Sequence, residues 1–206
     1  MIYNSLLKAF IILLLSLIGT DNCYSQLLFQ SNQSYSLDIY AASVQAGDVN
    51  NDGLEDMVYA IGSAFGSPSE YKIFVCTQSV TGTLSNPVAY SYQPVYPGLK
   101  CMRISDVNND GLKDVVIGYS DSIGIFFQNI GGTLNPMKSY FSGTGVDAIS
   151  CGDLNNDGLT DIAVGHWNTS FIRVFYQNGS GFTNNTYPKP NGGFDEIEIG
   201  DMNSDN

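Results

Sequence analysis

The residues best suited to chemistry in this chain are aspartates and asparagines that recur at a fixed spacing. Three complete copies of one nine-residue pattern begin at Asp48, Asp106 and Asp153, and a fourth begins at Asp201. Each complete copy carries oxygen-bearing side chains at positions 1, 3, 5 and 9, with Gly at position 6. Because Ca²⁺ takes about six to eight hard oxygen ligands, a short loop with this alternation is suited to hold it.

The pattern predicts one Ca²⁺ ion for each loop. Side chains at positions 1, 3, 5 and 9 and the backbone carbonyl at position 7 would supply the oxygens, and Gly at position 6 permits the sharp turn. The predicted ligands are Asp48, Asn50, Asp52, Leu54 and Asp56 in the first loop, Asp106, Asn108, Asp110, Leu112 and Asp114 in the second, Asp153, Asn155, Asp157, Leu159 and Asp161 in the third, and Asp201, Asn203 and Asp205 in the fourth.

Two other interpretations of the loops were weighed. An EF-hand needs an acidic ligand at position 12, but that position is Tyr59, Ile117 or Val164, so the EF-hand is disfavoured. A turn rich in Asn and Asp that holds no metal is the second alternative. Repetition of the same spacing with the same flanks favours the calcium loop.

Short strands are predicted on both sides of each loop. Apolar residues stand four and two positions before the first Asp, which is the period-two pattern of a strand with one buried face. These pairs are Val44 and Ala46, Met102 and Ile104, Ile149 and Cys151, and Ile197 and Ile199. After each loop comes a run of β-branched or aromatic residues, which favours a second strand. The Leu at position 7 is expected to turn its side chain into the core.

Third and fourth strands complete the predicted unit. The third strands are expected near 73–76, 125–129 and 174–178, with Cys76 aligned with Phe127 and Tyr176. Weaker fourth strands follow near 88–92, 138–141 and 185–187. The first aspartates are 58, 47 and 48 residues apart. Four short strands in a unit of this length describe the blade of a β-propeller.

The segment from Gly152 to Gly165 resembles the repeats of the FG-GAP and VCBS type found in integrin-alpha-like β-propellers. The resemblance extends over roughly residues 41–206. It implies an all-β propeller of four-stranded blades, with a calcium loop between the first and second strands of each blade. About three and a half blades would be present, so the chain is expected to be a fragment of a longer protein.

The predicted organisation follows from these repeats. Residues 1–25 are expected to be a signal peptide, because the apolar run after Lys8 is too short for a membrane span. Residues 26–42 would be N-terminal strands that complete the ring. Blade 1 is placed at 43–97, blade 2 at 98–145, blade 3 at 146–192, and the start of a truncated blade 4 at 193–206. A secreted or cell-surface location follows, with no membrane insertion after cleavage.

Few other residues suggest a function. The net charge of −12 opposes nucleic-acid binding. His166, Trp167 and the equivalent Tyr119 follow second strands, where an aromatic ring could stack on a sugar, so they are weak candidates for ligand binding. The sequence contains no Ser-His-Asp spacing, zinc motif or phosphate loop.

Three functions therefore compete. The first is a secreted calcium-binding β-propeller that binds a glycan or an extracellular protein, with calcium in a structural role. The second is the propeller part of a polysaccharide lyase or another carbohydrate-active enzyme. The third is a passive spacer in a surface protein. The lack of a catalytic motif favours the first.

Overall fold

The computed structural model describes residues 41–61, 71–92, 99–167, 169–189 and 196–200. All of them belong to one compact unit, Asp38–Asn206. The predicted signal peptide, residues 26–40 of the N-terminal segment and the fourth loop lie outside the described residues. Within the described part of the chain, no helix is long and apolar enough to cross a membrane.

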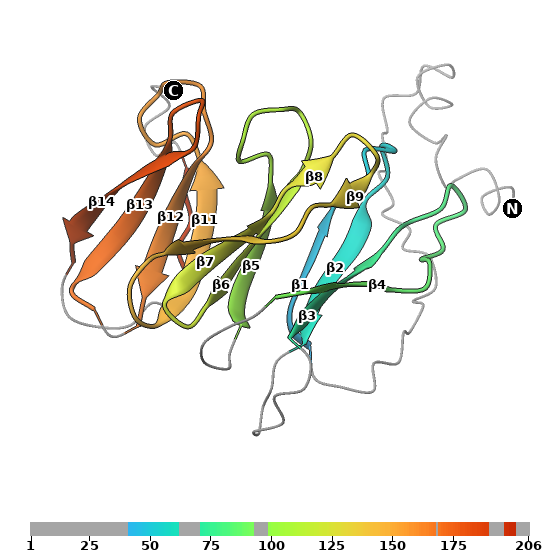
Figure 1. Cartoon of the computed structure of the whole chain (residues 1–206), viewed down its shortest axis with the longest axis horizontal. Coiled ribbons are helices and arrows are strands. Elements are labelled where there is room, and N and C mark those ends of the chain that lie inside the picture. Colours follow the sequence, from blue (N-terminus) through green and yellow to red (C-terminus); the bar gives the residue numbers. More distant parts are fainter. Residues whose placement is uncertain (1–40, 62–70, 93–98, 168, 190–195, 201–206) are drawn as a thin grey trace, which may run out of the picture. The chain divides into compact units, whose positions relative to one another are not determined.

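Three four-stranded antiparallel sheets follow one another along the chain. In Figure 1 the colour gradient therefore passes from the first sheet, in blue to green, to the third sheet, in orange to red. The first sheet contains β1 (Ala41–Gly47), β2 (Asp56–Ile61), β3 (Lys72–Cys76) and β4 (Val88–Ser91). The second contains β5 (Leu99–Ser105), β6 (Asp114–Tyr119), β7 (Ser122–Phe126) and β10 (Lys138–Phe141). The third contains β11 (Val146–Gly152), β12 (Asp161–His166), β13 (Phe171–Gln177) and β14 (Phe182–Pro188).

Each sheet runs in the order first, second, third, fourth strand, and the first three predicted loops each join the first strand to the second. A small hairpin of β8 (Gln128–Asn129) and β9 (Thr133–Leu134) leads to the last strand of the second sheet. These sheets confirm the predicted all-β fold of propeller-type blades. The first described strand begins at Ala41, two residues before the predicted start of blade 1 at residue 43.

Two hydrophobic clusters join the sheets in sequence. One joins the first sheet to the second and includes Val49, Ile73 and Phe126. The other joins the second sheet to the third and includes Val107 and Phe175. The first strands also lie in contact, since β5 touches both β1 and β11. The middle sheet is therefore covered on both sides, and its second strand β6 is buried throughout.

In the first and second loops the residue at position 2, rather than the Leu at position 7, is the main hydrophobic anchor, whereas Leu154 at position 2 of the third loop is 41% exposed. Val49 and Val107 are 2% and 0% exposed and belong to the inter-sheet clusters. The position 7 leucines, Leu54, Leu112 and Leu159, are only half-buried. The position 9 carboxylate holds the position 2 N–H in all three described loops, but the side chain is buried only in the first two loops, where it packs in an inter-sheet cluster.

The strand register also corrects the predicted alignment of Cys76. Met57 pairs with Cys76, Val115 with Phe126, and Ile162 with Phe175. Because Met57, Val115 and Ile162 each follow a position 9 Asp, Cys76 is equivalent to Phe126 and Phe175. The sequence alignment was displaced by one residue, since runs of apolar residues give no unique register. Cys76 is accordingly a buried core residue.

Close packing between the second and third sheets predicts a cost for adding one methyl group at Gly118. A Cβ at this residue would lie 2.6 Å from Val146 Cγ1 and would also meet the Cys101 thiol. We expect Gly118→Ala to lower the free energy of unfolding by about 1–3 kcal/mol because the core is overpacked. Urea unfolding measures the loss. Gly200→Ala is the control, because a Cβ there meets nothing within 4 Å, and an equal loss in both variants would contradict the packing described.

Candidate metal centre

The three loops share one backbone conformation. Position 4 is Asn51, Asn109 or Asn156, with φ of 61°, 59° and 60°. The glycines at position 6 have φ of 83°, 87° and 82°. Asn and Gly are the residues that most readily adopt this left-handed region. The loops are therefore copies of one structure as well as of one sequence.

Side chains at positions 1, 3 and 5 turn toward one another in every loop. In the third loop Asp153 accepts hydrogen bonds from the Gly158 N–H at 2.8 Å and the Asp157 N–H at 3.2 Å. The Asn155 amide oxygen accepts from the Asp157 N–H at 3.0 Å, and its nitrogen donates to the Asp157 carboxylate at 2.9 Å. The first and second loops repeat these contacts within 0.2 Å. The oxygens that were predicted to bind calcium are thus gathered by the loop itself.

The position 9 aspartates have a different environment. Asp56, Asp114 and Asp161 are at most 1% exposed. One carboxylate oxygen accepts from the position 2 N–H at 3.1, 3.1 and 3.0 Å. The other accepts from the N–H of a glutamine at the end of the third strand or two residues beyond it, at 2.8, 2.9 and 3.0 Å. Each position 9 carboxylate therefore clamps the loop to the third strand of its sheet.

Sequence reasoning missed the glutamines in this clamp. Gln78, Gln128 and Gln177 each provide the N–H that meets the position 9 carboxylate. Their recurrence after the third strand was a signal that could have located them, but the loops before them differ in length. The interval from the position 9 Asp is 22, 14 or 16 residues.

Burial and hydrogen bonding act in opposite directions on these carboxylates. Burial raises the pKa of Asp114 to about 7, although the N–H groups of Gln128 and Val107 lower it in part. Burial likewise raises the pKa values of Asp56 and Asp161. The N–H of Gly158 instead lowers the pKa of the exposed Asp153. Position 1 of the third loop is thus held as an anion, whereas position 9 lies where a negative charge is costly without a nearby cation.

The donor set fits a hard divalent cation. Each loop offers carboxylate, amide and carbonyl oxygens, and no Lys, Arg or His of the described residues lies within ion-pair distance of its carboxylates. Each position 9 oxygen keeps a second lone pair beyond the backbone hydrogen bond. Among the described residues, no group of three or more His, Cys, Asp or Glu side chains forms a metal cluster by itself. The loops therefore rely on Asn and carbonyl oxygens as well as on carboxylates.

One comparison with known proteins found a match within the repeated region. Residues 106–164 match the family model of the FG-GAP-like repeat. Residues 106–164 are therefore an FG-GAP-like repeat. The matched segment begins at the first residue of the second loop, includes the whole third loop and ends within β12. No curated protein matches the chain. The first loop lies outside the matched segment but has the same conformation and contacts.

The weaker ligand-binding candidates do not share one surface. His166 and Tyr119 are 0% and 4% exposed, so neither ring offers a face to a ligand. His166 lies 3.0 Å from the Ser142 hydroxyl and packs on Phe171, and burial lowers its pKa to about 4. Trp167 is 63% exposed and remains a predicted contact for a ligand.

The clamp predicts that position 9 contributes to stability even in the absence of metal. Asp114→Asn keeps one acceptor oxygen but sets an amide N–H₂ against a backbone N–H, leaving a buried donor unsatisfied. We expect a loss of about 1–3 kcal/mol in urea unfolding with a chelator present. Asp110→Asn, at the exposed position 5, should change the same measurement by less than about 0.5 kcal/mol. Equal effects of the two variants would argue against the clamp.

The raised pKa of Asp114 predicts a pH dependence of the metal-free protein. Because the folded-state pKa of about 7 exceeds the ordinary value of 3.8, the folded state holds this proton more tightly than the unfolded state. The stability contributed by protonation is complete below about pH 4 and is lost as the pH rises to about 7. Between pH 5 and 7.5 the wild type should therefore lose more stability than Asp114→Asn in chelator. Parallel pH profiles would show that the carboxyl group is already ionised at pH 5.

Proposed function

We propose that this FG-GAP-type chain is a calcium-binding β-propeller module that acts outside the cell by binding a glycan or a protein. The observation that carries the proposal is the threefold recurrence of one loop conformation, with its oxygens gathered and its carboxylates lacking a cationic partner among the described residues. Calcium would neutralise these carboxylates and cross-link positions 1, 3, 5, 7 and 9.

A structural role for calcium is supported by contacts between neighbouring loops. Asn109 of the second loop donates to the Gly158 carbonyl at 3.1 Å and accepts from the Thr160 N–H at 3.0 Å. The Gln177 side chain donates to the Asn108 carbonyl at 3.1 Å. Ordering the second loop therefore also fixes the third sheet against it.

Recognition rather than catalysis is supported by the character of the polar residues. The chain has a single histidine, and that residue is buried against Ser142, away from solvent. An extracellular location is supported by the signal-like N-terminal sequence and by the acidic loops. The lyase and spacer alternatives become outcomes of a test. Cleavage of an acidic polysaccharide would support the lyase, and neither cleavage nor binding would support the spacer.

Calcium titration of the full chain tests the metal. A ligand bound only by the folded state raises the melting temperature by mass action, so we expect an increase on adding Ca²⁺ and its reversal by chelator. Asp52→Asn, Asp110→Asn and Asp157→Asn should each reduce the calorimetric stoichiometry by one. Glu55→Gln is the matched control, because Glu55 is an exposed loop residue at position 8. An unchanged melting temperature and no binding heat would overturn the proposal.

A further inference from the structure

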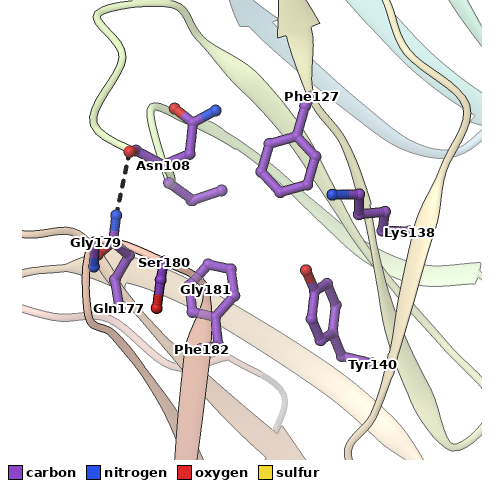
Figure 2. A pocket seen from close by; sticks show the side chains of 10 residues that line it. Asn108, Phe127, Lys138, Tyr140, Gln177, Gly179, Ser180, Gly181 and Phe182 are labelled. Atoms are coloured by element: carbon purple, nitrogen blue, oxygen red, sulfur yellow. Dashed lines mark hydrogen bonds between the residues drawn. The ribbon is translucent and has the colours of Figure 1, made fainter.

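A small pocket lies between the second and third sheets, beside the second loop. Its volume is about 240 Å³, below the roughly 300–1,000 Å³ of pockets for drug-sized ligands. Figure 2 shows the rings of Phe127, Tyr140 and Phe182 around it, with Lys138 beside Phe127. Asn108 and Gln177, joined by their hydrogen bond, form the opposite wall. The pocket therefore has room for one ring with its substituents.

Two polar groups in the pocket form neither an ion pair nor a hydrogen bond among the described residues. Lys138 and Tyr140 are two residues apart on β10, so they share one face of the strand. The Lys138 ammonium lies 5.3 Å from the centre of the Phe127 ring and forms no ion pair among the described residues. The Tyr140 hydroxyl likewise makes no hydrogen bond within the described part of the chain. A cation and a hydroxyl are thus available beside aromatic walls.

The equivalent place between the first and second sheets provides an internal comparison. Strand register makes Tyr90 equivalent to Tyr140, because they pair with Ile73 and Ile123. Tyr90 packs on Phe126 at 6.4 Å and 70°, and Tyr140 packs on Phe175 at 6.4 Å and 69°. The base of the two interfaces is therefore the same.

The rims of the two interfaces differ. At the first interface the Tyr90 hydroxyl accepts a hydrogen bond from the Leu134 N–H at 3.4 Å, and no lysine is present at the equivalent position. The register aligns three residues of the first interface with three that line the pocket: Thr77 with Phe127, Val88 with Lys138, and Leu134 with Phe182. At the second interface two aromatic rings and a cation thus stand where the first interface has smaller or neutral residues. The first interface shows that the repeat forms without these three side chains.

We propose that this pocket binds a single acidic sugar unit of a glycan, such as a uronic acid residue. The apolar face of a pyranose ring would lie against Phe127 and Phe182. Lys138 would pair with the carboxylate, and the Tyr140 hydroxyl would hydrogen-bond a ring substituent. The inference rests on the glycan-binding form of the proposed function and assigns it a site and a ligand class.

The local charge of the pocket favours an acidic occupant, although the chain as a whole carries 8 Lys and Arg residues against 20 Asp and Glu residues. Lys138 forms no ion pair with a carboxylate among the described residues. A basic ligand would meet this ammonium with like charge, and a neutral sugar would leave it unpaired. An anion pairs with the exposed lysine and also meets the hydroxyl and the aromatic walls.

Binding of two methyl glycosides by the full chain tests the assignment. We expect ligand-observed NMR titration to show methyl glucuronide binding about tenfold more tightly than methyl glucoside, as one charge-assisted contact would give. Lys138→Val should remove this preference, and Val88 shows that valine is accommodated at this register. Lys113→Gln is the control, because Lys113 is an exposed lysine of the second loop that does not line the pocket.

A second variant keeps the test independent of the charge. Phe182→Leu, which copies Leu134 of the first interface, should weaken both glycosides about equally because it removes a stacking wall. Thermal unfolding of every variant, measured in the presence of calcium, establishes that each one folds. Equal binding of the two glycosides by the wild type would overturn the site, as would an equal loss in Lys113→Gln. A calcium-dependent melting shift that persists despite such a result would leave the proposed calcium module intact and remove only the sugar site.

Discussion

A buried carboxylate at the end of each loop is the interaction on which the described structure depends. Asp114 is withdrawn from solvent, yet both of its oxygens are used by backbone N–H groups that no other acceptor serves. Burying this carboxyl group without hydrogen-bond partners would cost still more. One oxygen fixes the start of the loop, and the other fixes Gln128, which follows the third strand. Three strands of a sheet are thus organised around a single side chain, because the same residue begins the second strand.

In the first two loops the clamp lies directly beside the packing between sheets. The N–H of Val107 meets the Asp114 carboxylate, and its side chain packs in the cluster between the second and third sheets. Val49 of the first loop occupies the same place in the preceding cluster. In these two loops one residue therefore satisfies the carboxylate with its backbone and fills the core with its side chain. Calcium, on our proposal, would act on the exposed side of this arrangement.

Much of the fold could be predicted from the sequence because the loop motif marks the same point in each repeat. The strand order and the all-β class follow from the motif and its alternating flanks. The third-strand register could not be obtained, since Cys76 and Phe126 lie in apolar runs that fit equally well when displaced by one residue. Strand β8 was included in the predicted third strand near 125–129, and β9 was not among the predicted strands.

The candidate site was predicted in part. The loop oxygens were identified, but the clamp between position 9 and the glutamines depends on contacts across 14 to 22 residues, which no local pattern shows. His166 was predicted to bind a ligand because of its chemistry. It is the last residue of the buried strand β12, however, and is closed to solvent. The pocket was missed because its walls come from two repeats, and it becomes visible only when two sheets are placed together.

The matching Tyr–Phe contacts at the two interfaces have a wider consequence. Tyr90 on Phe126 and Tyr140 on Phe175 maintain the spacing between neighbouring sheets whatever stands at the rim. A substitution at Lys138 or Phe182 can therefore alter what an interface attracts without altering how the sheets assemble. Repeats that share this Tyr–Phe contact can therefore change their rim residues independently of one another. One chain can then present several different surfaces on sheets that pack in the same way.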